Sequence, residues 1–96
     1  MPALPFETPM LQGLSATRRE ERVQVVLHND DENDMAHVVG CLMAVFGHNE
    51  ALAVKIMMEA HDRGRAIAEV EAGPPARRHR NQLRLLGLAA TIEEIA

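Results

Sequence analysis

The sequence predicts an α+β domain: a small three-stranded antiparallel sheet backed by about three helices. Three observations support this fold class. In residues 23–28, Val23, Val25 and Leu27 alternate with Gln24, Val26 and His28, as in a strand with one strongly apolar face. Apolar residues then recur at helical spacing in two stretches, each preceded by Asn or Asp and followed by glycine. A shorter strand pattern and a third helical pattern follow, an order typical of a sheet covered by helices.

The first two helices are predicted from their end signals and apolar faces. The first has Asn33 or Asp34 as N-cap and ends at Gly47, whereas the second has Asn49 as N-cap and ends at Gly64. The apolar positions of the first helix are Met35, Val38, Val39, Leu42, Val45 and Phe46. The inner face of the second is predicted to be Ala53, Ile56, Met57 and Ala60, with His61 on the same edge.

The C-terminal third is predicted in less detail. "RAIAEV" (65–70) is a short strand candidate, and Pro75 suits the first turn of a helix through "ARRHRNQLRLLG". The tail "LAATIEEIA" has two interpretations. Thr91 and Glu94 match a capping box, which predicts a helix, but polarity also alternates along the tail as in an edge strand.

Length and composition limit the domain organisation. Ninety-six residues suit one core domain, predicted over 21–96. Residues 1–20 contain three prolines and a glycine without a sustained period, so we expect a flexible N-terminal arm. A net charge of −4 argues against nucleic acid as a partner, and no apolar run is long enough to cross a membrane. The lone Cys41 and the absence of a signal-peptide pattern predict a cytoplasmic protein.

The acidic segment "NDDEND", residues 29–34, has more polar side chains than a turn needs. A solvated turn that caps the next helix is one interpretation. A calcium loop starting at Asp30 is excluded, because it would need Gly in place of Met35 and Glu in place of Cys41. The third interpretation is a receptor for a cation.

The cation-receptor hypothesis depends on what lies beside the acidic segment. Asn29 and Asp30 follow directly after a strand, where side chains can converge. The apolar positions expected nearby are Met35, Val38, Met57 and Ala60, with His61 at their edge. Oxygen acceptors next to a methionine-lined hollow suit a ligand with a positive head and an apolar body.

Other chemistries have little support in the sequence. The five histidines show no compact ligand spacing, so we expect no metal and no cofactor. No nucleophile-and-base pair or phosphate-binding loop is visible, and we expect a protein that is not an enzyme.

The segments "VVLHNDDENDMAHVVGCLMAVFG" and "ALAVKIMMEAHDRGRA" resemble ClpS, the adaptor family of the bacterial N-end rule pathway. The resemblance covers about residues 22–70. It implies a small α+β domain that binds substrate proteins through a free α-amino group and a bulky hydrophobic first residue (Leu, Phe, Tyr or Trp). It also implies delivery of these N-degron substrates to the N-terminal domain of a ClpA-type AAA+ unfoldase, for degradation by ClpP.

The resemblance assigns roles to individual positions. Asn29, Asp30 and His61 correspond to the residues that bind the α-amino group. The hydrophobic pocket corresponds to Met35, Val38, Met57, Ala60 and Leu88.

Departures from the family pattern leave a second hypothesis open. Ala60 replaces a usual Val or Ile, and the match decays after Val70 into an Arg-rich segment, 76–84. A divergent second paralogue would show such changes. The alternative function is a non-catalytic interaction module that docks on the unfoldase and modulates substrate choice without binding N-degrons.

Overall fold

Three strands and three helices make up residues 22–95, the part of the chain that the computed structural model describes. They are β1 (Arg22–His28), α2 (Met35–Phe46), α3 (Glu50–Arg63), β2 (Arg65–Ala72), α4 (Gly73–Leu85) and β3 (Ala90–Glu94). The predicted α+β fold class is confirmed. The predicted N-terminal arm, residues 1–20, lies outside the described residues.

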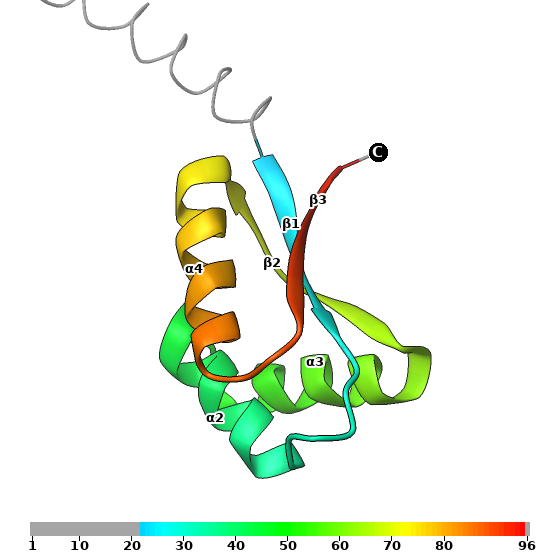
Figure 1. Ribbon diagram of the computed structural model, residues 1–96. Coiled ribbons are helices and arrows are strands. Elements are labelled where there is room, and N and C mark those ends of the chain that lie inside the picture. Colours follow the sequence, from blue (N-terminus) through cyan, green and yellow to red (C-terminus); the bar gives the residue numbers. More distant parts are fainter. Residues whose placement is uncertain (1–21, 96) are drawn as a thin grey trace, which may run out of the picture.

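The sheet is antiparallel throughout, with β1 in the centre and the order β2-β1-β3 (Figure 1). Val26 of β1 lies opposite Thr91 of β3 and Ile67 of β2. The tail pairs with β1 and is therefore a strand, so the strand interpretation is confirmed and the helix interpretation is wrong. His28 adds a side-chain contact, because its Nε2 lies 2.7 Å from the Thr91 hydroxyl.

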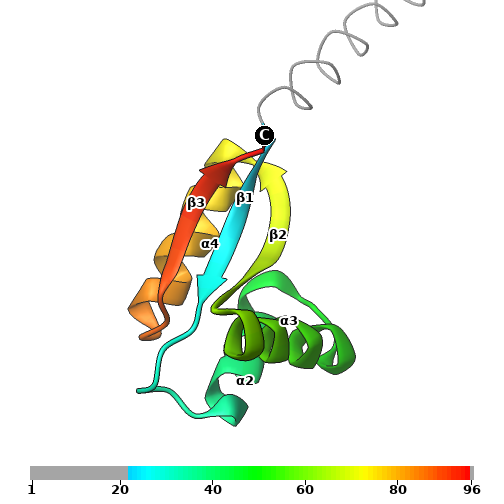
Figure 2. The same cartoon turned by 90° about the vertical axis from the view of Figure 1, so that its right-hand side faces the viewer.

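The helices pack against the sheet at two places, one face and one end. α4 lies against one face of the sheet, and α2 and α3 lie together beyond the end at which β1 finishes and β2 begins (Figure 2). Apolar residues from both places share one core with the sheet. Its fully or nearly fully buried members include Val25, Leu27, Leu42, Ala53, Ile56, Ala60, Leu83 and Leu88.

The ends of α2 and α3 follow the predicted capping pattern. Asp34 is the N-cap of α2 and accepts a hydrogen bond of 2.7 Å from the His37 amide. Asn49 does the same for α3 with the Leu52 amide, at 2.9 Å. Both helices end at glycines with left-handed backbone, with φ of 74° at Gly47 and 90° at Gly64, where a side chain would be strained.

Three boundaries in the C-terminal third differ from the predicted ones. β2 extends two residues beyond Val70 to Ala72, because Arg22 and Val23 of β1 pair with its last residues. α4 ends at Leu85 rather than at Gly87, since the backbone turns left-handed at Gly87 with φ 91°. α4 begins at Gly73, two residues before the predicted Pro75, and Pro74 lies in its first turn, where a missing N–H costs nothing.

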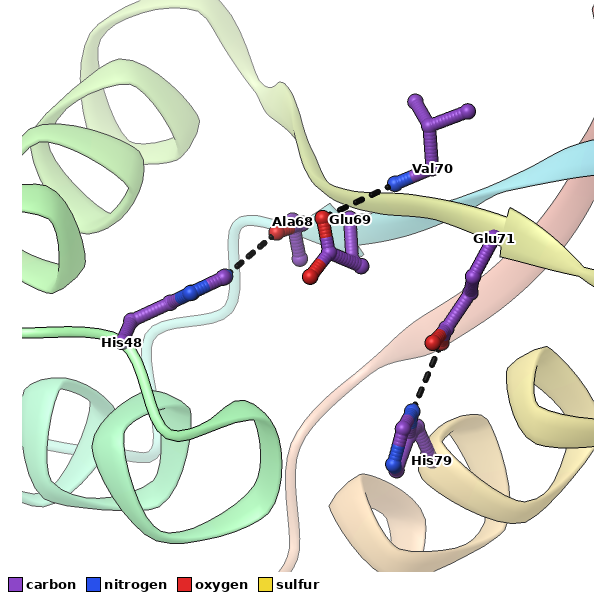
Figure 3. Close-up of polar contacts among 6 residues, drawn as sticks. All are labelled: His48, Ala68, Glu69, Val70, Glu71 and His79. Carbon is purple, nitrogen blue, oxygen red and sulfur yellow. Dashed lines mark hydrogen bonds and ion pairs between the residues drawn. The ribbon is translucent and has the colours of Figure 1, made fainter.

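Two histidines attach β2 to the helices (Figure 3). The register of β2 against β1 passes from Glu69 to Ile67, which leaves Ala68 as an unpaired bulge residue. His48, in the α2–α3 connection, donates from Nε2 to the Ala68 carbonyl at 2.8 Å. His79 of α4 lies 2.6 Å from the Glu71 carboxylate. The Phe46 ring lies between these histidines, with centroid distances of 5.1 Å to His48 and 5.0 Å to His79.

The bulge contact yields a stability prediction. Replacing His48 with Ala removes the hydrogen bond to the Ala68 carbonyl and the stacking on Phe46. We expect the free energy of unfolding to fall by about 1–3 kcal/mol, measured by urea denaturation. Lys55→Ala, on the exposed side of α3, is the control and should change it by less than about 0.5 kcal/mol. Equal effects of the two substitutions would contradict this role of His48.

Candidate functional site

The acidic segment between β1 and α2 folds around the Asp30 side chain. Oδ1 of Asp30 accepts hydrogen bonds from the backbone N–H groups of Glu32 and Asn33, each at 3.0 Å. The Asn33 side-chain amide donates to both carboxylate oxygens, at 3.1 and 3.2 Å. An aspartate that bonds amides two and three residues ahead holds the chain in a tight turn. The Asp30 carboxylate is therefore occupied mainly in shaping this segment.

These contacts also set the charge state of Asp30. Burial favours the neutral acid and raises the pKa of the Asp30 carboxyl. Hydrogen bonds from the Asn33 and Glu32 amides and from the Asn33 side chain act in the opposite direction and outweigh burial. The pKa of Asp30 is lowered below its ordinary value of 3.8, so the side chain stays negative in the neutral range.

The turn is joined to distant segments on both sides. The Asn29 N–H donates to the Gly64 carbonyl at the end of α3, at 3.0 Å. On the other side, the Asn33 amide donates to the Gly87 carbonyl at 2.8 Å. His37 Nε2 reaches the Leu86 carbonyl at 2.9 Å. The turn therefore connects the end of α3 with the α4–β3 loop.

A half-open cavity of about 340 Å³ lies beside the turn. It is bounded by the end of β1, the acidic segment, the first turns of α2 and the last turns of α3. Its lining residues are Leu27, His28, Asn29, Asp30, Asp31, Asn33, Asp34, Met35, Val38, Met57, Ala60 and His61. Met57 and Ala60 are buried, and Met35 is 48% exposed, at the mouth.

The structure brings together most of the predicted site residues. The three predicted polar residues, Asn29, Asp30 and His61, line this one cavity. So do four of the five predicted apolar residues, which come from α2 and α3. Leu88 is the exception. It is 3% exposed, belongs to the core, and follows the left-handed Gly87 that turns the chain inward.

Asp31 is a cavity residue that sequence reasoning missed. It is exposed, and within residues 22–95 its carboxylate makes no hydrogen bond or ion pair, in contrast to the neighbouring Asp30. The side chains of Asn29 and His61 are likewise without a hydrogen-bond partner in that part of the chain. Three acceptor-bearing side chains are therefore available at the polar side of the cavity.

Two further properties concern the part of the chain that the structure describes. Its His, Cys, Asp and Glu side chains form no group of three or more that could hold a metal ion. None of its helices combines the length and the apolar character needed to traverse a bilayer.

Comparison with known proteins identifies the class. The family model described as "ATP-dependent Clp protease adaptor protein ClpS" matches residues 18–91. That span includes every residue that lines the cavity. The match therefore assigns the chain to a class of protease adaptors. The chain belongs to the ClpS family.

Individual relatives agree with this assignment. The chain is 42% identical over 73 residues to the Clp protease adapter protein ClpS of Synechococcus elongatus, covering 75% of this chain and 77% of that one. It is 36% identical over 97 residues to the chloroplastic adapter protein CLPS1 of Arabidopsis thaliana, covering 96% of this chain. The chain spans 61% of the length of that plant relative.

A solved structure is similar in fold. Agrobacterium tumefaciens ClpS2, bound to L-phenylalaninamide, superposes with a TM-score of 0.73 at 29% identity. The superposition covers 79% of this chain and 99% of the Agrobacterium chain.

The Asp30 turn yields a pH-dependent prediction. Asp30→Ala removes the hydrogen bonds that hold the turn and should lower the free energy of unfolding by about 1–2 kcal/mol at pH 7. The folded-state pKa of Asp30 is lowered, so its contribution is present above the ordinary value of 3.8 and is lost as the pH falls through the folded value. The difference between wild type and variant should therefore narrow below about pH 3.8 in urea titrations. Asp62→Asn on exposed α3 is the control, and a difference that stays constant or widens in acid would contradict the account.

Proposed function

We propose that the cavity binds the N-terminal residue of substrate proteins, with a free α-amino group and a bulky hydrophobic side chain. The observation behind this proposal is the pairing of unpartnered acceptors with an apolar interior in one cavity of about 340 Å³. That volume is within the range of small-molecule sites. The Agrobacterium relative is described as bound to L-phenylalaninamide, a ligand with both features.

The polar side of the cavity suits a primary ammonium ion. Such an ion has three N–H donors and loses water on entry, so it needs several acceptors in a defined arrangement. Asn29, Asp31 and His61 supply them in this proposal. Asp31 makes its bond charge-assisted, because its carboxylate is not engaged by the turn. Asp30 holds the turn and adds negative charge beside the same cavity.

The apolar side suits a large hydrocarbon side chain. Met35, Val38, Met57 and Ala60 surround this part of the cavity. Transfer of a Leu or Phe side chain out of water contributes about 1.5–3 kcal/mol, which a small first residue such as Ala would largely lose. Methionine side chains adapt to different shapes, so several bulky residues fit the same pocket.

Binding of this kind serves delivery rather than catalysis. Membership of the ClpS family supports delivery of the captured protein to a ClpA-type AAA+ unfoldase, through the N-terminal domain of that enzyme, for degradation by ClpP. The proposal places the chain in the cytoplasm as a non-enzyme, and its lone cysteine, Cys41, is buried and free. If the cavity binds no peptide with a bulky N-terminal residue, the alternative is a module that docks on the unfoldase and modulates substrate choice without binding N-degrons.

A single substitution tests the amine contact. Asp31→Asn should weaken binding of labelled peptides with a free N-terminal Leu, Phe, Tyr or Trp by about tenfold to a hundredfold, because it removes a charge-assisted bond. Its free energy of unfolding should change by less than about 0.5 kcal/mol. Fluorescence anisotropy measures the binding.

N-acetylated peptides and peptides beginning with Ala are the ligand controls for this measurement, and Asp62→Asn is the protein control. Acetylated and free peptides that bind equally well would rule out amine recognition. Wild-type affinity in Asp31→Asn would remove this residue from the contact.

A second prediction separates recognition from delivery. The cavity residues that the structure describes all lie within 27–61, and the family match begins at residue 18. A variant without residues 1–20 should therefore bind these peptides with wild-type affinity but support their degradation by a ClpAP-type protease poorly. Proteolysis of a reporter that begins with Leu measures delivery. Equal degradation with the full chain and with the shortened variant would contradict a role of residues 1–20 in delivery.

A further inference from the structure

A second hollow begins at the mouth of the cavity and extends along the outside of α2. Its volume is about 410 Å³. The lining residues are Met35, Ala36, Val39, Gly40 and Met43 of α2, with Glu50 and Val54 of α3. We call this hollow the α2–α3 groove. Met35, Met43 and Val54 are 48%, 38% and 37% exposed, so three large apolar side chains reach solvent along this hollow.

Gly40 lines the groove, and packing does not require a glycine at this position of α2. A glycine inside a helix costs about 0.5–1 kcal/mol relative to Ala. Steric crowding does not force a glycine here, because a Cβ at residue 40 would meet no other atom within 4 Å. Gly40 lines the groove, so a side chain longer than that of alanine would extend into it. Glycine leaves this part of the groove open.

We propose that the α2–α3 groove binds the residues that follow the N-terminal residue of the substrate, and that it favours apolar side chains there. This inference rests on the proposed function of the neighbouring cavity. Met35 lines both hollows, so a chain whose first residue lies in the cavity and that leaves past Met35 enters the groove. The substrate is therefore the occupant whose path is continuous with the site.

The dimensions and charge of the groove define the preference. Met35 and Met43 are separated by about 12 Å along the helix axis, which an extended chain covers in about three or four residues. The groove should therefore contact about the second to fourth substrate positions. Among the described residues that line the groove, Glu50 is the only charged one. Its negative charge should therefore disfavour acidic side chains at substrate positions two to four.

The test compares ligands with and without these positions. L-Phenylalaninamide ends after the first residue. Two peptides begin with Phe and have either Ala or Leu at positions two to four. Their affinities are measured by calorimetry for the wild type, Gly40→Gln and Gly40→Ala. Gln places an uncharged polar side chain in the groove, whereas Ala adds one methyl group to open space; both replacements favour the helix.

We expect the Leu-containing peptide to bind the wild type and Gly40→Ala about threefold to tenfold more tightly than the Ala-containing peptide. In Gly40→Gln this preference should fall below about twofold, while L-phenylalaninamide binds all three proteins equally.

Each other outcome overturns the proposal in a distinguishable way. Binding of L-phenylalaninamide without a preference at positions two to four would reject the groove but keep the cavity. A preference that persists in Gly40→Gln would place the contact elsewhere. Failure of every ligand to bind would reject both proposals. A wild type that sediments as a dimer and is dissociated by Gly40→Gln would assign the groove to a second copy of the chain.

Discussion

The turn built on Asp30 is the constraint on which the site depends. Its carboxylate bonds the Glu32 and Asn33 amides, and Asn33 in turn bonds the Gly87 carbonyl. These contacts join the end of β1, the start of α2 and the α4–β3 loop, although the segments are far apart in the sequence. Hydrogen bonds stabilise the ionised form of Asp30 against the opposing effect of burial. The turn is therefore strongest in the neutral range.

The same turn explains why free acceptors lie beside an apolar pocket. By satisfying the amides of the turn with one carboxylate, it leaves the neighbouring Asp31 without a protein partner among the described residues. Asp31, Asn29 and His61 are exposed, so water solvates them at little cost while no ligand is bound. The buried Met57 and Ala60 begin directly alongside. In the proposed complex, adjacent parts of this one cavity would therefore hold the cationic head and the apolar body of the ligand.

Sequence patterns predicted the elements well and the site incompletely. Helix limits such as Asn49 and Gly64 depend on local capping chemistry, which a sequence displays directly. The tail has two valid local patterns, and pairing with β1 chose between them. The unpartnered carboxylate of Asp31 could not be predicted, because adjacent carboxylates look alike until the turn determines which one bonds its own backbone. Leu88, which the resemblance assigns to the pocket, is a buried core residue and is not among the residues that line the cavity.

A crystal structure of the chain with L-phenylalaninamide would show whether the cavity beside the Asp30 turn holds an N-terminal residue. We expect the ammonium group within hydrogen-bonding distance of Asn29, Asp31 and His61, and the phenyl ring among Met35, Val38 and Met57. We also expect the Asp30 turn to keep its position when the ligand binds. A ligand bound elsewhere, or one whose amino group faces solvent while Asp31 remains free, would rule out recognition of the amino group by this cavity.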